Sequence, residues 1–461
     1  MLKDVITNQK KLFIPGAHTE LRSEIIRTRR VSSVMGNIMG NARSQEMGLC
    51  ARVYKNGIYG FSSRADITDD AAKSVLKAAS ENAVFLDSHV NKGTNTIPPL
   101  EGKNVIEVQD LPETEQKVYI DFVKEVDDYV AKKYPNLSSR TVVAMEESFE
   151  KQLATSDGVD SHIVLPRSYV YVFMASETKD GMPVELFEAF GGEGIFTGNF
   201  SGAESLHEKI DKLYERLMEK KEGVYAEAGE KTVILGGMMT GMLAHEAVGH
   251  TVEADIVRSG SVALHNLNKR VASELVSLTD FAYEAFGERA PLPVFADDEG
   301  TAAIDCPLIK DGILVGYMNS RETARDFGME PTGNARAFSP SDEPLIRMRN
   351  TAIHPGKDKL EDMIASIDDG YYLISSTNGE ADITGEFMFG VDMGYEIKNG
   401  KLGKALLDTT VSGVAFDMLK TVDMISDKVV WSSSGYCGKK QPMPVGMGGP
   451  ALRCKITIGG R

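Results

Sequence analysis

Residues 48–63 read GLCARVYKNGIYGFSS, and this stretch contains the pattern that decides the fold class. Two runs with the residue types of β-strands flank the dipeptide Asn56-Gly57. A two-residue type I′ turn needs positive φ at both central positions, which Asn and Gly tolerate, and it joins neighbouring antiparallel strands. We therefore predict a β-hairpin at this point.

The same turn chemistry occurs twice more in the chain. Residues 308–318, LIKDGILVGYM, centre on Asp311-Gly312, and residues 395–406, YEIKNGKLGKAL, centre on Asn399-Gly400. The three sites do not recur at a fixed period, so they do not form a repeat array. They indicate a chain that is rich in antiparallel sheet.

Helical periodicity marks three segments, which we expect to pack on this sheet. The first begins after the candidate N-cap Thr68 and runs toward Phe85. The second covers residues 113–135, and the third covers residues 201–223. Their apolar stripes are Val75, Leu76 and Ala79 in the first, Val118, Phe122, Val126 and Tyr129 in the second, and Leu206, Ile210, Leu213 and Leu217 in the third.

Between the second and third helices we expect strands at residues 140–148, 150–156 and 161–176. Residues 1–34 are mixed and polar and carry the basic cluster RSEIIRTRR, and a final strand is expected near the chain end. The predicted fold class is α+β, with large, mostly antiparallel sheets and flanking helices. A polar stretch near residues 223–230 favours three units, an N-terminal α+β unit at 1–100, a central α+β unit at 101–228 and a β-rich unit at 229–461.

Composition excludes several classes of protein. The 461 residues include 51 Lys and Arg against 67 Asp and Glu, a net charge of −16, which disfavours direct binding of nucleic acid. The four cysteines lie far apart, so they indicate neither a disulfide framework nor a four-cysteine zinc finger. There is no apolar stretch of transmembrane length and no signal-peptide pattern at the start, so we expect a cytoplasmic protein that is not inserted in a membrane.

Residues 239–255, MTGMLAHEAVGHTVEAD, contain His245, Glu246 and His250 in an HExxxH pattern. Two imidazoles and one carboxylate this close together suit zinc with an adjacent general base. The usual spacing is HExxH, whereas a five-residue separation places the two rings about 140° apart on an ideal helix. We therefore expect the helix to bulge or end between them, with Gly249 in a left-handed or irregular conformation. Two buried core histidines remain the alternative to a metal site, and His265 and His354 are weaker candidate ligands.

Five segments together resemble the TldD/PmbA family, once named modulators of DNA gyrase. They are HEAVGHTVEAD (245–255), ADDEGT (296–301), IKDGILVGYMNS (309–320), PTGNAR (331–336) and SSSGYCGKKQPMPVGMGGPALR (432–453), and GLCARVYKNGIYGFSS resembles the family's amino-terminal hairpin. The resemblance implies a TldD/PmbA-like fold and a cytoplasmic metallopeptidase of the TldD branch. It also implies that zinc is held by His245, His250 and Cys437, whereas we expect Cys50, Cys306 and Cys454 to be buried apolar groups.

On this basis we expect a zinc-dependent peptidase that hydrolyses peptide bonds in unfolded or modified peptides. Glu246 would act as the general base on the zinc-bound water. The resemblance implies a homodimer, or a heterodimer with a paralogous TldE/PmbA-like subunit. The alternative function is a non-catalytic regulatory or scaffold subunit, similar to a gyrase modulator, with a structural metal site.

Three further features have two interpretations each. Glu253 would accept a hydrogen bond from a ligand imidazole, or compete with Cys437 as a ligand. The acidic residues at 297–299 would form a solvated turn or bind a peptide amino terminus. The glycine-rich VGMGGP (445–450) would form loop structure, or leave strand edges open for an extended peptide.

Overall fold

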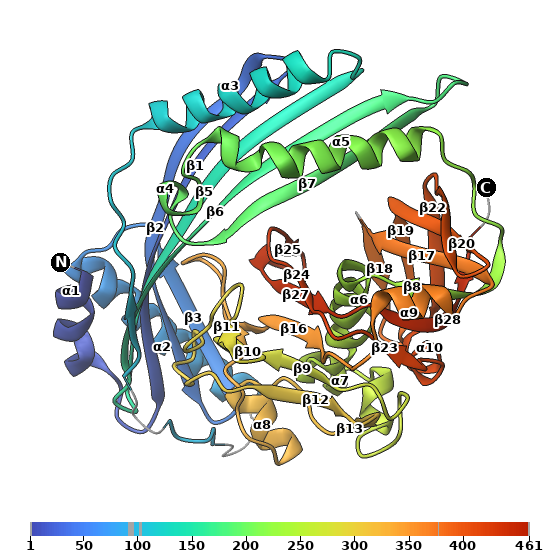
Figure 1. The fold of residues 1–461 in the computed structure, drawn as a ribbon. Coiled ribbons are helices and arrows are strands. Elements are labelled where there is room, and N and C mark those ends of the chain that lie inside the picture. Colours follow the sequence, from blue (N-terminus) through green and yellow to red (C-terminus); the bar gives the residue numbers. More distant parts are fainter. Residues whose placement is uncertain (1, 91–95, 101–103, 377, 460–461) are drawn as a thin grey trace.

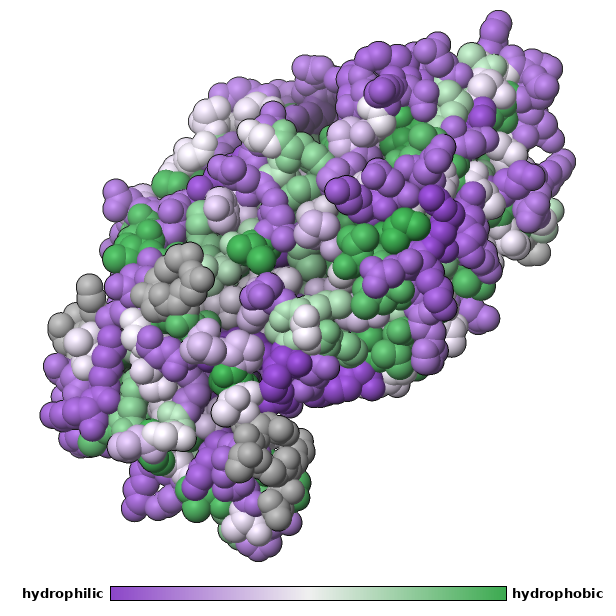
Figure 2. Space-filling view, turned by 90° about the horizontal axis from the view of Figure 1, so that it is seen from below, coloured by the Kyte–Doolittle hydropathy of each residue, from purple (hydrophilic) through white to green (hydrophobic). Residues whose placement is uncertain are grey.

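A computed structural model describes residues 2–90, 96–100, 104–376 and 378–459 of the chain (Figure 1). Within these ranges the protein is a mixed structure of large sheets and flanking helices, as predicted. No helix in the described ranges combines the length and apolar character needed to cross a lipid bilayer. Figure 2 shows one face, on which hydrophilic residues predominate and hydrophobic residues lie in groups between them.

The N-terminal half builds one long, curved sheet of seven strands, counted over the described residues, and this sheet arches over the C-terminal half (Figure 1). The strand order is β3-β2-β1-β5-β6-β4, and β7 also pairs with β6. The strands are β1 (His18–Val34), β2 (Asn37–Lys55), β3 (Ile58–Arg64), β4 (Ile106–Val108), β5 (Ser139–Thr155), β6 (Asp160–Glu177) and β7 (Pro183–Glu193).

Five α-helices belong to the described part of this half, and two of them, α3 and α5, cover one face of the sheet. Alternate residues of β6, including Val170 and Val172, share a buried core with the apolar faces of α3 and α5. The helices are α1 (Leu2–Gln9), α2 (Asp69–Val90), α3 (Gln116–Lys133), α4 (Phe196–Asn199) and α5 (His207–Lys221).

The C-terminal half contains a nine-stranded sheet in the order β18-β19-β22-β28-β8-β17-β20-β21, with β23 paired to β28, among the residues described. Its strands are β8 (Gly229–Leu235), β17 (Asp369–Ser375), β18 (Gly379–Ala381), β19 (Glu386–Val391), β20 (Met393–Lys398), β21 (Lys401–Ala405), β22 (Thr409–Val414), β23 (Met424–Ile425) and β28 (Leu452–Ile458).

A six-stranded sheet, again counted over the described part of the chain, lies beside it in the order β13-β12-β9-β16-β27-β24. Its strands are β9 (Leu278–Phe281), β12 (Cys306–Lys310), β13 (Ile313–Leu314), β16 (Asn350–Ile353), β24 (Val430–Ser432) and β27 (Gly446–Gly449). The short strand pairs are β10 (Glu284–Ala285) with β11 (Glu288–Arg289), β14 (Ala335–Arg336) with β15 (Leu345–Ile346), and β25 (Tyr436–Cys437) with β26 (Met443–Pro444).

Five short α-helices complete the described part of this half. They are α6 (Gly237–Met242), α7 (Ala254–Arg258), α8 (Arg321–Phe327), α9 (Leu360–Ala365) and α10 (Ala415–Lys420). A large core packs α6 and the turns that follow it against both C-terminal sheets.

All three predicted hairpins are present. The turns link β2 to β3, β12 to β13 and β20 to β21, and both central residues of each turn have positive φ. All three predicted helices are present as well, and the N-cap prediction holds because the Thr68 hydroxyl accepts a hydrogen bond from the Ala71 N–H at 3.1 Å. The final strand is β28.

Three expectations about local structure need correction. In α3 the buried stripe includes Tyr119 and Val130, whereas Val118 is 39% exposed, because the Tyr119 ring packs against Phe196. The strands expected at 140–148 and 150–156 form the single strand β5. VGMGGP does not leave open strand edges, because β27 pairs with β16 on one side and with β24 on the other.

The mixed, polar segment at the start contains β1, the 17-residue strand between β2 and β5. Its charged side chains are compatible with burial because they are paired: Glu20 accepts hydrogen bonds from Arg52, and Arg22 lies 3.4 Å from Asp298. Strands of the first two predicted units therefore share one sheet, and the three-unit division stays a prediction.

Candidate metal centre

The HExxxH segment lies on a helix that bulges, as its spacing requires. A π-helical turn at Leu243–Gly249 follows α6 directly, and the His250 N–H donates to the His245 carbonyl, five residues earlier. Such i→i+5 turns insert an extra residue into an α-helix. This bulge brings His245 and His250 to the same side of the helix, and their ring centroids are 5.1 Å apart.

Gly249 does not act through an unusual backbone conformation, which corrects the expectation from the sequence. Its φ and ψ are −53° and −51°, ordinary helical values. A Cβ at this position would lie 2.1 Å from the Sδ atom of Met348, whose side chain is 1% exposed. Glycine therefore lets the bulged helix pack closely against Met348, whose buried side chain would have to shift to make room for a Cβ.

We expect Gly249→Ala to destabilise the protein, although alanine in place of glycine stabilises most helices by about 1 kcal/mol. Overpacking against the buried Met348 should lower the free energy of unfolding by about 1–3 kcal/mol. The measurement is urea unfolding of the metal-free protein. The matched control is Gly192→Ala, because a Cβ there meets no atom within 4 Å. Equal stability of the two variants would contradict the steric explanation.

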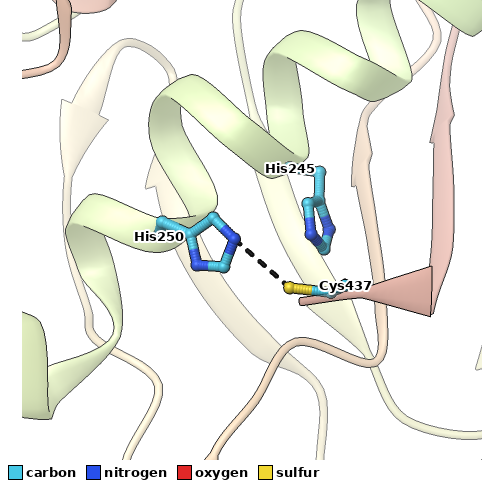
Figure 3. Close-up of side chains that lie close together, drawn as sticks. All are labelled: His245, His250 and Cys437. Carbon is cyan, nitrogen blue, oxygen red and sulfur yellow. Dashed lines mark hydrogen bonds between the residues drawn. The ribbon is translucent and has the colours of Figure 1, made fainter. Parts of the chain in front are cut away.

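Cys437 lies close to both histidines, although it is 187 residues beyond His250. The three side chains point toward one another, the two rings from the helix and the sulfur from β25 (Figure 3). Their ligand atoms all lie within 4.8 Å of one another, and Cys437 Sγ is 3.3 Å from His250 Nε2. Among the described residues this is the only such group of three His, Cys, Asp or Glu side chains, so His265 and His354 do not belong to it.

The donor set fits a zinc ion. The His245 side chain is only 1% exposed, and neither of its ring nitrogens has a hydrogen-bond partner. A buried imidazole without partners is costly, and a metal ion would satisfy one of its two nitrogens. Two imidazoles and one thiolate are common zinc ligands, and they leave a fourth tetrahedral position for water or substrate.

The site favours a thiolate on Cys437. Burial alone would raise the pKa of this thiol, but the proximity and charge of His245 and His250 outweigh burial and lower the pKa to about 4. Burial would lower the pKa of His250, but the charge of Glu253 and the contact with Cys437 outweigh it and raise the pKa to about 10. The metal-free site therefore holds a thiolate beside an imidazolium, and metal binding would release the proton of His250.

The pKa values of the other three cysteine thiols are shifted in the opposite direction to that of Cys437. Cys50, Cys306 and Cys454 are buried and free, and burial raises the pKa of all three thiols, to about 11 for Cys50 and about 12 for Cys306. Cys306 and Cys454 lie in the large apolar core, as predicted, whereas Cys50 is buried beside the charged side chains of Arg22 and Glu24.

Glu253 contacts the His250 ring at Nδ1, the nitrogen that does not face Cys437. Its side chain is fully buried, and one carboxylate oxygen lies 2.8 Å from His250 Nδ1. This contact leaves His250 Nε2 directed toward Cys437, so the carboxylate lies where a residue that orients a candidate ligand would lie. The ammonium of Lys439 lies 3.0 Å from the same Glu253 carboxylate and 2.8 Å from Asp255, so it joins the Cys437 segment to the His250 segment.

Glu246 lies beside the three candidate ligands and reaches solvent. Its carboxylate oxygens are 3.6 Å from His250 Nε2 and 4.0 Å from His245 Nε2, and its side chain is 24% exposed. Together with His245 it lines a cleft of about 550 Å³. The cleft lies between β7 of the large sheet and β17, β18 and β24, and its apolar wall includes Met238, Met242 and Trp431.

The acidic residues at 297–299 are not a solvated turn, which corrects one of the two interpretations. Asp297, Asp298 and Glu299 are all buried. Glu299 pairs with Arg52 at 2.7 Å, and Asp298 pairs with Lys151 at 3.0 Å. These ion pairs connect the large sheet to the C-terminal half.

Two segments of the chain match models of known protein families, and one of these segments contains His245, His250 and Cys437. Residues 228–460 match the PmbA/TldA metallopeptidase C-terminal domain, and residues 19–83 match PmbA/TldA metallopeptidase domain 1. The zinc metalloprotease TldD homolog of Saccharolobus solfataricus is 31% identical, with 90% of each chain covered. A metalloprotease of Methanocaldococcus jannaschii is 30% identical, with 97% of this chain and 98% of that protein covered.

A solved structure shows the same fold at lower sequence identity. TldE from Thermococcus kodakarensis superposes with a TM-score of 0.75 at 16% identity, with 100% of both chains covered. The matched domains and the relatives that cover at least 90% of the chain agree on one assignment. The chain belongs to the TldD/PmbA family of metallopeptidases.

Proposed function

We propose that the protein is a zinc-dependent peptidase that hydrolyses peptide bonds in unfolded or modified peptides. The observation that carries this proposal is the convergence of His245, His250 and Cys437 beside Glu246, at the wall of an open cleft. Purely structural zinc sites are closed by a fourth protein ligand, whereas catalytic sites keep one position open. This difference favours the peptidase over a scaffold subunit with a structural metal.

Each residue has a role that follows from its position. His245, His250 and Cys437 would hold zinc, and Glu253 orients the His250 ring through Nδ1. A bound zinc ion supplies Lewis-acid chemistry, which polarises the scissile carbonyl and makes water acidic near neutral pH. Glu246 takes the proton from the attacking water and delivers it to the leaving amine. Its distances of 3.6 and 4.0 Å from the ligand nitrogens support this assignment.

The cleft suits extended peptides of varied sequence. Methionine side chains adapt to different apolar partners, and Met238, Met242, Met393 and Met447 line the cleft. β24 is the last strand of the six-stranded sheet among the described residues, and Val430–Ser432 form part of the cleft wall. An extended peptide would add to this edge by main-chain hydrogen bonds. An unfolded chain offers many such segments, whereas most of the backbone of a folded protein is already paired.

The proposal includes a partner subunit, which is either a second copy of the chain or a TldE/PmbA-like paralogue. The fold shared with TldE over the full length of both chains supports the second form. The cytoplasmic location remains a prediction.

The test of the proposed activity is digestion of a denatured protein. We expect the zinc-loaded enzyme to cleave a reduced, unfolded substrate and to leave the same protein intact when it is folded. A chelator should stop cleavage, and added zinc should restore it. Cleavage that persists after complete removal of metal would contradict the proposal, as would a zinc-loaded protein that cleaves no unfolded substrate.

A further inference from the structure

The segment that leads to Cys437 has few means of fixing its own conformation. β24 ends at Ser432 and β25 begins at Tyr436, so residues 433–435, Ser-Ser-Gly, connect two strands. Within the part of the chain that the structure describes, no backbone–backbone hydrogen bond joins these three residues to another segment. A Cβ on Gly435 would meet no atom within 4 Å, so the segment is loosely surrounded there. Ordering such a segment costs conformational entropy, which outside contacts must offset.

Two tyrosines of the large sheet supply such contacts. The Tyr169 hydroxyl donates to the Ser433 carbonyl at 2.7 Å, and the Tyr171 hydroxyl donates to the Ser434 carbonyl at 2.9 Å. Both tyrosines lie on β6, two residues apart, so they project from the same face of the sheet. This face is opposite to the one on which Val170 and Val172 pack with the helices. In the sequence Tyr-Val-Tyr-Val (169–172), the two valines therefore pack against the helices, and the two tyrosines contact the segment before Cys437.

A third contact holds the residue directly before Cys437. The Tyr436 hydroxyl donates to a carboxylate oxygen of Glu147 at 2.9 Å. Arg167 donates to the same oxygen from Nε and Nη2, at 2.9 and 2.7 Å, and its guanidinium lies 4.4 Å from the centre of the Tyr436 ring. Glu147 and Arg167 are directly opposite each other in the β5–β6 register, and both are buried. A rigid pair on the sheet thus fixes the Tyr436 ring.

We propose that Tyr169, Tyr171 and Glu147 are positioning residues, by which the N-terminal sheet places the Cys437 sulfur for metal binding. This inference rests on the proposed metal site. All three ligands lie between residues 245 and 437, whereas these three residues lie on β5 and β6 of the other half of the chain. The three contacts hold Ser433, Ser434 and Tyr436. These are three of the four residues directly before Cys437. Side chains of β5 and β6 therefore hold residues 433–436 in the conformation that directs the Cys437 sulfur toward the two histidines.

Removing the two tyrosine hydroxyls should weaken zinc binding without changing any ligand. The thiolate would then have to be ordered when the metal binds, and its sulfur would occupy several positions relative to His245 and His250. Loss of residues that orient ligands typically lowers metal affinity about 10- to 100-fold. We expect a loss in this range for the Tyr169→Phe/Tyr171→Phe double variant.

The experiment compares this double variant with wild type and with Tyr317→Phe. Tyr317 is a matched control because it is 2% exposed and its hydroxyl donates to the Ala263 carbonyl at 3.0 Å, away from the ligand segment. Three quantities are measured on the full-length chain: zinc affinity by competition with a chromophoric chelator, the sulfur-to-metal charge-transfer band of the cobalt-substituted protein, and the thermal midpoint of the metal-free protein. The single variants Tyr169→Phe and Tyr171→Phe replace the double variant if it does not fold.

We expect weaker zinc binding and a shifted or weakened charge-transfer band in the tyrosine variants, with wild-type values for both in Tyr317→Phe. Wild-type affinity and an unchanged band in the tyrosine variants would overturn the inference. Equal losses of affinity in Tyr317→Phe would also overturn it, because the effect would then reflect general destabilisation. A wild-type protein that binds no stoichiometric zinc would overturn the metal site itself, an outcome distinct from the first two.

Discussion

Glu246→Gln is expected to lose peptide hydrolysis almost completely and to keep its zinc. The amide retains the size of the carboxylate but cannot accept the proton of the attacking water, and removal of a general base typically costs about 10²- to 10⁴-fold in rate. Zinc should remain bound because the three candidate ligands are His245, His250 and Cys437. The measurements are the cleavage rate of an unfolded substrate at saturation and the zinc content per chain.

Glu246→Asp provides the graded control for this prediction. Aspartate keeps the carboxylate base, but its side chain is shorter by one methylene group, so the base lies further from the water. The cleavage rate of this variant should lie between those of wild type and Glu246→Gln. Full activity of Glu246→Gln would remove this residue from the mechanism. Loss of zinc from Glu246→Gln would instead give the glutamate a role in holding the metal.

Cys437→Ser is expected to lose most of its bound zinc and all zinc-dependent cleavage. A serine hydroxyl is a poor zinc ligand because it stays protonated near neutral pH, whereas the neighbouring imidazoles lower the pKa of the Cys437 thiol to about 4. Two histidines alone would hold the ion weakly. Zinc content after dialysis, with free zinc controlled by a buffer, measures the loss.

Cys454→Ser is the control for this substitution. Cys454 is also buried, at 1% exposure, but it lies on β28 opposite Val233, within a core of apolar residues. We expect this variant to keep its zinc. Zinc lost only from Cys454→Ser would overturn the ligand assignment, and zinc kept by both variants would exclude Cys437 and Cys454 as ligands.

Features set by neighbouring residues could be predicted from the sequence. The three Asn-Gly and Asp-Gly turns depend on local φ preferences, so their hairpins follow from two residues each. The bulge in the HExxxH helix follows from the five-residue spacing combined with the requirement that both rings reach one ion. The family resemblance supplied Cys437, which spacing alone would not distinguish from the other three cysteines.

Features set by distant contacts could not be predicted in this way. β1 has a polar sequence and is nevertheless a strand inside the sheet. Its charged side chains can be buried because residues of other elements, such as Arg52 and Asp298, form ion pairs with them. The reason for Gly249 is the Met348 side chain, which lies 99 residues further along the chain. The contacts of Tyr169 and Tyr171 with residues 433 and 434 span more than 260 positions, and no local pattern contains that information.

The most direct test of the central claim is X-ray absorption at the zinc edge of the wild-type protein. The proposed site predicts one sulfur at about 2.3 Å and two imidazole nitrogens at about 2.0–2.1 Å, with one further light ligand. The Cys437→Ser variant, reloaded with zinc, should lack the sulfur, and Cys454→Ser should retain it. A wild-type spectrum without a sulfur ligand, or one with fewer than two imidazoles, would contradict the account.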